Sequence, residues 1–270
     1  MDTRKALAFI REHGDALAHA RAMALLEGTP PTPEVVAGLE RGASPGGGWP
    51  AGLEVGSPGG IGATVEVLFS LADLGLEEHP LAQKGLAFLL ARQEPDGAWQ
   101  EPPAERASPL RWLRQGEEAG RLYLTAWVGS LLVAYGREED PAVTRALDLL
   151  LKCQLPGGAF TGFPRHTTWY ALPLLARRLG IRSGPTQNIL LFLGQELGEK
   201  GWFASMFAAM LHNLLLSGYG METALVRTSW EQLLLRQGED GSWASEEGEA
   251  DGVRTTLEVL WCWKRIIQPA

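Results

Sequence analysis

Five side chains in the sequence are candidates for acid–base chemistry: Glu66, Glu118, His166, Asp251 and Glu258. Each lies at or near the start of a segment in which apolar residues recur round a helix, as in "GATVEVLFSLADLG" around Glu66. A carboxyl group in such apolar surroundings has a raised pKa and can donate a proton to a ligand. Glu118 has a competing interpretation, because the polar run "RQGEEAG" around it is typical of a solvated loop.

Aromatic side chains and one arginine are candidates for ligand binding. They lie in or beside the same apolar segments: Tyr123, Trp127, Trp169, Tyr170, Trp202, Phe203, Phe207 and Arg254. Aromatic rings can line a pocket for a hydrophobic ligand and can stabilise a positive charge with their π faces. They can equally fill a protein core, so the pattern leaves both interpretations open.

The sequence does not predict a metal site. Zinc needs ligands at matching depth, whereas His166 and His212 stand alone. Cys153 and Cys262 fall in apolar helical patterns rather than in a paired spacing, which indicates buried thiols. We therefore expect no zinc and no cofactor.

The elements that must position these residues are marked by a repeated turn. Five copies occur: "SPGGGW", "QEPDGAW", "QLPGGAF", "QELGEKGW" and "QGEDGSW". The last four follow apolar runs rich in leucine, and each copy is followed, after a variable loop, by a second apolar run. Asp-Gly and Gly-Gly steps permit a positive φ, so we expect these segments to turn the chain between two helices.

Helix pairs joined by such turns predict an all-α protein, because no alternating strand pattern of any length is present. Most of the second runs end at Gly, and several of the next helices open near a Pro. The acid pairs at 77–78 and 138–139 stand beside these starts, where helix capping is the expected role. A helix from about Arg4 to Leu26 and a weaker one from about Pro33 to Gly42 bring the expected number to about eleven.

The second helix of each pair is apolar on nearly all sides, whereas the first has a polar face, so the second helices are expected to be buried. Stacked helix pairs either extend as a solenoid or close on themselves, and this asymmetry favours closure. We predict a single (α/α)6-type toroid domain over residues 1–270, built from five to six helix-pair repeats with six inner helices.

Composition and charge narrow the class of protein. The 270 residues, 45% hydrophobic and 21% charged, are typical of a globular protein with a sizeable core. The net charge of -8 argues against a nucleic-acid partner, because phosphate binding needs a basic field. Asp2 and Arg11 interrupt any apolar run at the N-terminus, so we expect neither a signal peptide nor an integral membrane segment, and a cytoplasmic location.

The turns "QEPDGAW" and "QGEDGSW" resemble the QW repeat of squalene and oxidosqualene cyclases and of protein prenyltransferase β subunits. The resemblance covers nearly the whole chain and implies an α/α toroid with its pocket at one mouth, between the N-terminal ends of the inner helices. It implies that the Gln and the indole of each turn are scaffold residues, which we expect to tie an outer helix to the next inner one. It also implies a hydrophobic or isoprenoid small molecule as ligand, and a partner subunit or a homodimer.

The catalytic signatures of these families are missing. Squalene-hopene and class II diterpene cyclases carry a DxDD acid just before an inner helix, whereas no pair of aspartates precedes "GATVEVL", "LTAW" or "HTTWY" here. The metal-binding DDxxD pattern of class I terpene enzymes has only acid pairs at turns as counterparts, so Mg²⁺ is expected only if the ligand is a diphosphate.

One further segment, "GEADGVRTTLEVL", resembles the prenyltransferase segment whose arginine faces the substrate diphosphate. The matching residue is Arg254, although the additional Gly252 departs from the pattern. A helix N-cap role for Asp251, with Arg254 at the rim of the pocket, is the competing interpretation.

Three functions stay open on the sequence. The first is an isoprenoid-handling enzyme of the cyclase or prenyltransferase type. The second is a non-catalytic toroid that binds a hydrophobic ligand or a protein segment in the same mouth, since the acid and zinc motifs are missing. The third is a carbohydrate-active (α/α)6 barrel with Glu66 and Glu258 as paired carboxylates.

Overall fold

The fold consists of helices. The computed structural model describes residues 1–101, 117–199, 201–248 and 251–268, and within these ranges the chain forms twelve α-helices, one short 3₁₀ helix (η1, Ala51–Leu53) and no β-strand. Six helices are outer ones: α1 (Thr3–His13), α3 (Pro33–Gly42), α5 (Pro80–Leu90), α7 (Pro141–Cys153), α9 (Gly184–Glu196) and α11 (Ala224–Leu235). Six are inner ones: α2 (Ala16–Glu27), α4 (Ile61–Asp73), α6 (Glu118–Ala134), α8 (Pro164–Leu179), α10 (Ala204–Leu216) and α12 (Gly252–Ile267). The all-α prediction is confirmed.

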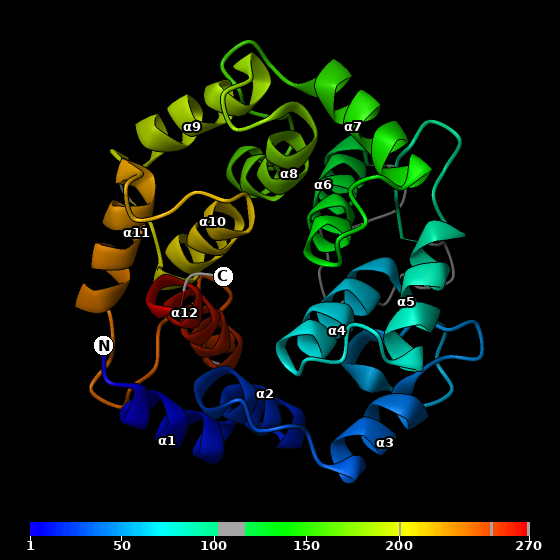
Figure 1. Ribbon diagram of the computed structural model, residues 1–270, viewed down its shortest axis with the longest axis vertical. Coiled ribbons are helices and arrows are strands. Elements are labelled where there is room, and N and C mark those ends of the chain that lie inside the picture. The colour runs from blue at the N-terminus through cyan, green and yellow to red at the C-terminus, as the bar shows by residue number, and fades with distance from the viewer. Residues whose placement is uncertain (102–116, 200, 249–250, 269–270) are drawn as a thin grey trace.

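The inner helices stand in a ring inside the outer ones, and the ring closes on itself (Figure 1). Each inner helix packs against the next one, and the last, α12, packs against both α1 and α2. The C-terminal end of the chain therefore meets the N-terminal end. The predicted closed toroid with six inner helices is confirmed.

The first helix pair differs from the prediction. The prediction of a single helix from Arg4 to Leu26 is wrong, because the first helix ends before Gly14 and a second helix begins after Asp15. Gly14 has an extended backbone, and the Asp15 carboxylate accepts a hydrogen bond of 2.7 Å from the N–H of Ala18, which caps α2. The segment is thus a complete outer–inner pair, which raises the number of helices from the expected eleven to twelve.

The capping role expected for the acid pairs at 77–78 and 138–139 is also wrong. The caps of α5 and α7 are His79 and Asp140, whose side chains each accept a hydrogen bond from the backbone N–H two residues further on. Each cap directly precedes the proline that opens its helix. The capping atom has to lie at this one position to reach the free N–H groups, so an acid one residue earlier cannot replace it.

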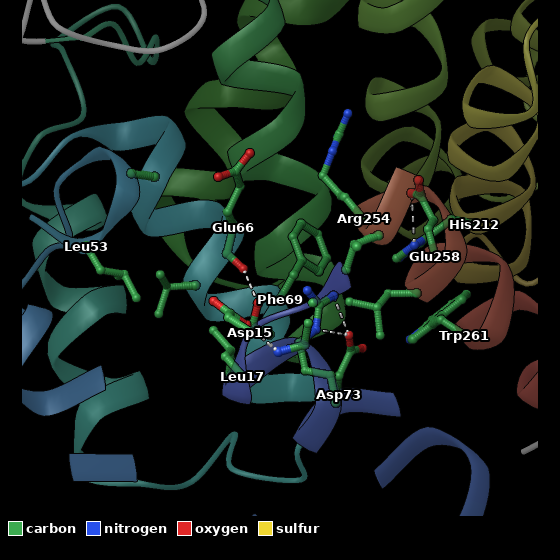
Figure 2. Close-up of a pocket in the computed structure, with 18 of the residues that line it drawn as sticks. Asp15, Leu17, Leu53, Glu66, Phe69, Asp73, His212, Arg254, Glu258 and Trp261 are labelled. Carbon is green, nitrogen blue, oxygen red and sulfur yellow. Dashed lines mark hydrogen bonds and ion pairs between the residues drawn. The ribbon is translucent and has the colours of Figure 1, made fainter. Parts of the chain in front are cut away.

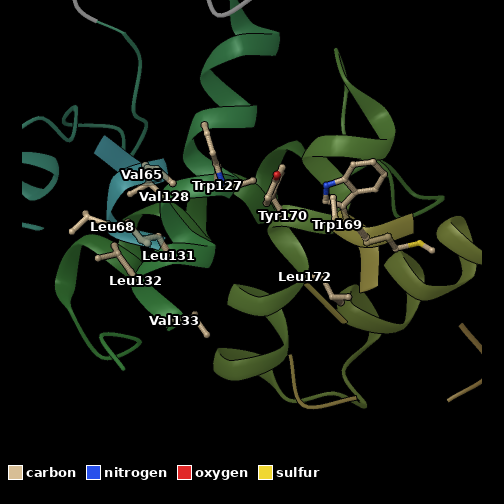
Figure 3. Close-up of a cluster of buried hydrophobic side chains, with 14 of the residues drawn as sticks. Val65, Leu68, Trp127, Val128, Leu131, Leu132, Val133, Trp169, Tyr170 and Leu172 are labelled. Atoms are coloured by element: carbon tan, nitrogen blue, oxygen red, sulfur yellow. The ribbon is translucent and has the colours of Figure 1, made fainter. Parts of the chain in front are cut away.

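The core fills the space between the two rings and between neighbouring inner helices. Figure 3 shows its part between α4, α6 and α8, with Val65 and Leu68 facing Val128, Leu131 and other fully buried side chains. Helices α6 and α8 are buried on nearly every side, as their all-round apolar pattern predicts. Among the described residues, no helix combines the length and the apolar character needed to cross a bilayer.

Three of the repeated turns are fixed by the same tryptophan hydrogen bonds. The indole N–H groups of Trp49, Trp99 and Trp243 donate to the backbone carbonyl ten residues earlier, near the end of the preceding outer helix, at 2.9, 2.8 and 2.7 Å. The backbone N–H of each tryptophan donates to a threonine hydroxyl of the next inner helix: Thr64, Thr125 or Thr256. Each tryptophan therefore ties an outer helix to the following inner helix, through its indole on one side and its backbone on the other.

The glutamines make a different connection from the expected one. The side-chain amides of Gln93, Gln154 and Gln237 donate at 2.7, 2.9 and 2.8 Å to a backbone carbonyl at the start of the next outer helix, not the next inner one. For Gln237 that carbonyl belongs to Asp2, the N-cap of α1, and the N–H of Asp2 donates back to Gln237 Oε1 at 2.7 Å. The last turn thus binds the first helix and closes the outer ring.

Candidate active site

A cavity of about 520 Å³ lies at the centre of the ring, within the size range of small-molecule sites. All six inner helices contribute side chains to its wall. One example from each helix, in chain order, is Arg21, Glu66, Trp127, Tyr170, His212 and Arg254. Figure 2 shows part of this wall. The predicted pocket lay between the N-terminal ends of the inner helices, whereas the wall of this cavity extends along them as far as Asp73, the last residue of α4.

Glu66, on α4, faces the cavity without a partner for its carboxylate. Its side chain is exposed to the cavity, yet protein surrounds it, and this burial raises the pKa of the Glu66 carboxyl. Arg254 and Arg21 oppose the rise, and Asp251 adds to it. Among the described residues, its carboxylate has no hydrogen bond or ion pair; its backbone carbonyl accepts one from Ser70 at 2.9 Å.

Arg254, on the first turn of α12, extends in the same direction as Glu66 (Figure 2). Its guanidinium donates to both carboxylate oxygens of Asp251 at 2.6 and 2.7 Å. Burial is the largest single effect and opposes the charge, but the hydrogen bonds to Asp251 and the negative charges of Asp251 and Glu258 together raise the pKa of Arg254. Asp251 stands at the N-cap position without making a side-chain cap, so the expected capping role is wrong; its carboxylate is bound by Arg254 and by the Ser245 hydroxyl, at 2.7 Å.

A second ion pair lies in the cavity wall, away from the charged end of Glu66 (Figure 2). Arg21 of α2 donates from Nε and Nη2 to one oxygen of Asp73 of α4, at 2.9 and 2.6 Å. The Asp73 side chain is 7% exposed and that of Arg21 is 19% exposed, so water screens this pair weakly. Both arginines of the described wall are therefore already paired with a carboxylate.

Aromatic rings form much of the remaining wall. Trp127 and Tyr170 contribute from α6 and α8, with their ring centroids 5.8 Å apart. Phe69 of α4 and Trp261 of α12 lie on either side of His212, which comes from α10. The described wall thus combines π faces with the carboxyl group of Glu66, an arrangement that can hold an apolar chain and stabilise a positive charge on it.

The structure brings together only some of the predicted acids. Glu66 and Glu258 both line the cavity. Asp251 does not line it but is bound to Arg254, which does. Glu118 is exposed at the first residue of α6, outside the described cavity wall. His166 also lies outside that wall and pairs with Glu246 at 3.0 Å.

The predicted aromatic set divides in the same way. Trp127 and Tyr170 line the cavity, while Tyr123 lies behind them with its ring edge-on to Tyr170 at 5.4 Å. Trp202 packs between Trp169 and Phe207, at 6.2 and 5.1 Å, in the core. Phe203 is 47% exposed, and both it and Trp202 precede α10 rather than lying on an inner helix.

Several wall residues were not among the predicted ones, and four of them are charged or aromatic side chains that matter for the cavity: Arg21, Phe69, Asp73 and Trp261. A signal for three of them was present, because Phe69 and Asp73 follow Glu66 by three and seven residues, and Trp261 follows Arg254 by seven. This spacing places side chains on one face of a helix. Arg21 could not be predicted in this way, because the sequence analysis treats α1 and α2 as one helix and so does not identify α2 as an inner helix.

Metal ligands do not gather in the described part of the chain. No group of three or more His, Cys, Asp or Glu side chains there could hold a metal ion. The two cysteines are free; Cys262 is buried, and burial raises the pKa of its thiol well above the usual value.

With the closed double ring and its central cavity, the chain has the architecture of an all-α toroid. No protein-family model matches the chain. It is similar to a probable squalene–hopene cyclase of Sinorhizobium fredii, with 29% identity over 139 residues, or 46% of this chain. The match spans 21% of that relative, so the chain corresponds to about a fifth of its length.

Solved structures show the same fold over almost the whole chain. A variant of the type II terpene cyclase MstE from Scytonema, in complex with its substrate geranylgeranyl dihydroxybenzoate, aligns over 97% of this chain and 95% of its own, with a TM-score of 0.64 and 17% identity. The apo form of MstE aligns over 97% and 96%, with a TM-score of 0.60 and 18% identity. A protein from Actinoplanes aligns over 96% and 97%, with a TM-score of 0.64 and 19% identity. The fold is therefore a terpenoid cyclase-like toroid.

Proposed function

We propose that the protein is a terpene cyclase-like enzyme that holds an isoprenoid chain in its central cavity and protonates one of the double bonds with Glu66. The observation that carries this proposal is the state of Glu66: a carboxyl group directed into an aromatic cavity, unpaired among the described residues, with a pKa raised by burial. Alkene protonation requires a carboxyl group in its protonated form, and a raised pKa favours that form.

The other carboxylates of the cavity are less suited to this role. Asp73 is held by Arg21, and Asp251, behind the wall, is held by Arg254. Glu258 lies beside the imidazole of His212, with 3.5 Å between Oε1 and Nδ1. Asp15 accepts a hydrogen bond from the backbone N–H of Ala18. A carboxylate that is already bound to another group is less free to turn toward a ligand, whereas the Glu66 carboxyl group has no such partner among the described residues.

The carbocation formed by protonation needs stabilisation without a nucleophile. Trp127, Tyr170, Phe69 and Trp261 line the cavity that Glu66 faces, and the π face of each ring attracts a cation. These rings can hold the folded chain while its double bonds react in turn. The Sinorhizobium relative and the MstE complex support an isoprenoid as the class of ligand.

The charges of the cavity favour an uncharged isoprenoid over a diphosphate. Besides the proposed acid Glu66, the described wall contains the carboxylates of Asp15, Asp73 and Glu258. Both of its arginines are already bound to a carboxylate. A diphosphate would have to displace these partners and would be repelled by the remaining acids. Squalene or a prenyl alcohol meets neither obstacle.

Turnover and binding assays test the proposal. The protein is incubated with squalene, geranylgeraniol or geranylgeranyl diphosphate in D₂O, and products are analysed by gas chromatography and mass spectrometry. We expect a cyclised product of an uncharged substrate that carries one deuterium from the acid. Glu66→Gln is expected to lower the rate by about 10²- to 10⁴-fold, because it removes a general acid, while ligand-induced thermal stabilisation is retained.

Glu118→Gln is the matched control, since Glu118 is exposed and outside the cavity wall; it should leave the rate unchanged. Thermal stabilisation without product would favour the non-catalytic toroid. Neither product nor stabilisation with any of the three compounds would remove the isoprenoid proposal. The carbohydrate alternative needs Glu258 as a free second carboxylate, and its position beside His212 argues against it.

A further inference from the structure

His212 is held in the cavity wall by aromatic rings from two other helices. Its imidazole stacks on the indole of Trp261, with 3.9 Å between the ring centroids and 7° between the planes. Phe69 meets the same imidazole edge-on at 5.6 Å and 82°. Because α4 and α10 are opposite one another in the ring of six, the contact between Phe69 and His212 spans the ring (Figures 1 and 2).

Glu258 orients this imidazole. Its carboxylate Oε1 lies 3.5 Å from Nδ1 of His212, and Figure 2 shows the two side chains facing each other. A carboxylate beside Nδ1 favours the tautomer with the proton on that nitrogen, which leaves the lone pair on Nε2. Among the described residues, the imidazole contacts Glu258 through Nδ1 and Phe69 and Trp261 through its ring, while Nε2 makes no hydrogen bond. The ring thus keeps an acceptor available in a wall that is otherwise largely aromatic.

The position of His212 relative to Glu66 has a chemical meaning. Phe69, which contacts His212, follows Glu66 by three residues on α4, so Glu66 and the contact with His212 lie on one face of that helix, about one turn apart. Because both side chains line the same cavity, a ligand in it can contact the Glu66 carboxyl group and the His212 imidazole.

We infer that His212 is the base that ends the reaction proposed above, and that Glu258 is its positioning residue. Glu66 transfers its proton to a double bond, which leaves a Glu66 carboxylate and a carbocation. After ring closure, Nε2 of His212 removes a proton from a carbon beside the final cation, and the electron pair of that C–H bond forms the new double bond. The imidazolium releases its proton to water and Glu66 takes one up, so the substrate is isomerised without net gain or loss of protons. This inference rests on the proposed function.

Product analysis of His212 variants tests the inference. His212→Phe keeps an aromatic ring to stack on Trp261 but has no nitrogen. Because protonation by Glu66 comes first, we expect the variant to consume substrate at a rate within about tenfold of the wild type, since a general acid step is worth far more than that. The predominant alkene should be replaced by a mixture of alkene isomers and alcohols, because the cation is then quenched by water.

Glu258→Gln separates positioning from a merely structural role. It should change the product ratio in the same direction as His212→Phe with an unchanged KM, and the double variant should change it no further, because both residues act through one nitrogen. His166→Phe is the matched control: His166 also pairs with a glutamate, Glu246 at 3.0 Å, but lies outside the cavity wall, and its product ratio should equal that of the wild type.

The outcomes separate the two proposals. If the wild type forms a cyclic product and His212→Phe forms the same product ratio, the inference is wrong and the proposed function stands. If His212→Phe binds substrate but consumes none, His212 acts in protonation and the inference is also wrong. If the wild type consumes no isoprenoid, both fail together.

Discussion

Replacing Gly241 by alanine tests how the toroid closes. Gly241 belongs to the last repeated turn and has φ of +94°, a conformation in which a side chain costs about 1 to 3 kcal/mol. A Cβ atom at this position would also overlap the backbone carbonyl group of Lys5 in α1. Relief of that overlap has to move the turn away from the first helix and should cost about a further 2 kcal/mol, as for an overpacked core.

Gly218 is the matched control because its φ is +90° and an added Cβ would meet nothing within 4 Å. Both variants therefore share the backbone strain, and only Gly241→Ala carries the overlap. At about 3 °C per kcal/mol for a chain of this size class, Gly241→Ala should melt about 6 °C below Gly218→Ala. The measurement is thermal unfolding followed by far-ultraviolet circular dichroism at a fixed pH.

Equal melting temperatures for the two variants would refute the reasoning. They would mean that the last turn does not press against α1, so that the hydrogen bonds between Gln237 and Asp2, at 2.7 and 2.8 Å, do not fix the closure. The cavity wall formed by α2 would then not be held rigidly, since α2 is held in the ring partly through its contacts with α1.

Two further predictions concern the cavity. Burial raises the folded-state pKa of Glu66 above the ordinary 4.5. The stabilising contribution of Glu66 is therefore complete below pH 4.5 and is lost as the pH rises through the raised pKa. In urea unfolding, the stability of Glu66→Gln should fall less with rising pH than that of the wild type, and parallel curves would contradict this. Asp251→Asn frees Arg254, and since hydrogen bonds to a charged group are worth about 1.5 kcal/mol or more, geranylgeranyl diphosphate should bind about tenfold more tightly, with geranylgeraniol unchanged. Calorimetric titration of both ligands measures this, and an unchanged affinity for the diphosphate would show that Arg254 does not control the charge preference.

The sequence was sufficient for the fold because the turn chemistry is local and repeated. Each Trp of the motif reaches a carbonyl ten residues earlier, so the information lies within one short segment. The partner of each Gln lies on the next outer helix, 31 to 49 residues further on for Gln154 and Gln93. The first helix pair is predicted as one helix because it has no such turn, and only Gly14 and Asp15 separate α1 from α2.

The site was only partly predictable because its members depend on how the ring closes. Helical spacing from Glu66 and Arg254 could have identified Phe69, Asp73 and Trp261, since each depends on one helix alone. By contrast, the pairing of Arg21 with Asp73 joins residues 52 positions apart. The contact of Phe69 with His212 joins opposite sides of the ring.

The proposed acid can be recognised only from such distant pairings. In the sequence Glu66, Asp73 and Glu258 are equivalent acids on apolar helices. The closed ring brings Arg21 to Asp73 and His212 to Glu258, while Glu66 receives no partner among the described residues and faces aromatic rings instead. Apolar burial raises the pKa of the Glu66 carboxyl group and favours its protonated form, which is why we propose Glu66, rather than the arginine-bound Asp73, as the proton donor. The role of each carboxylate therefore follows from which helix the ring places opposite it.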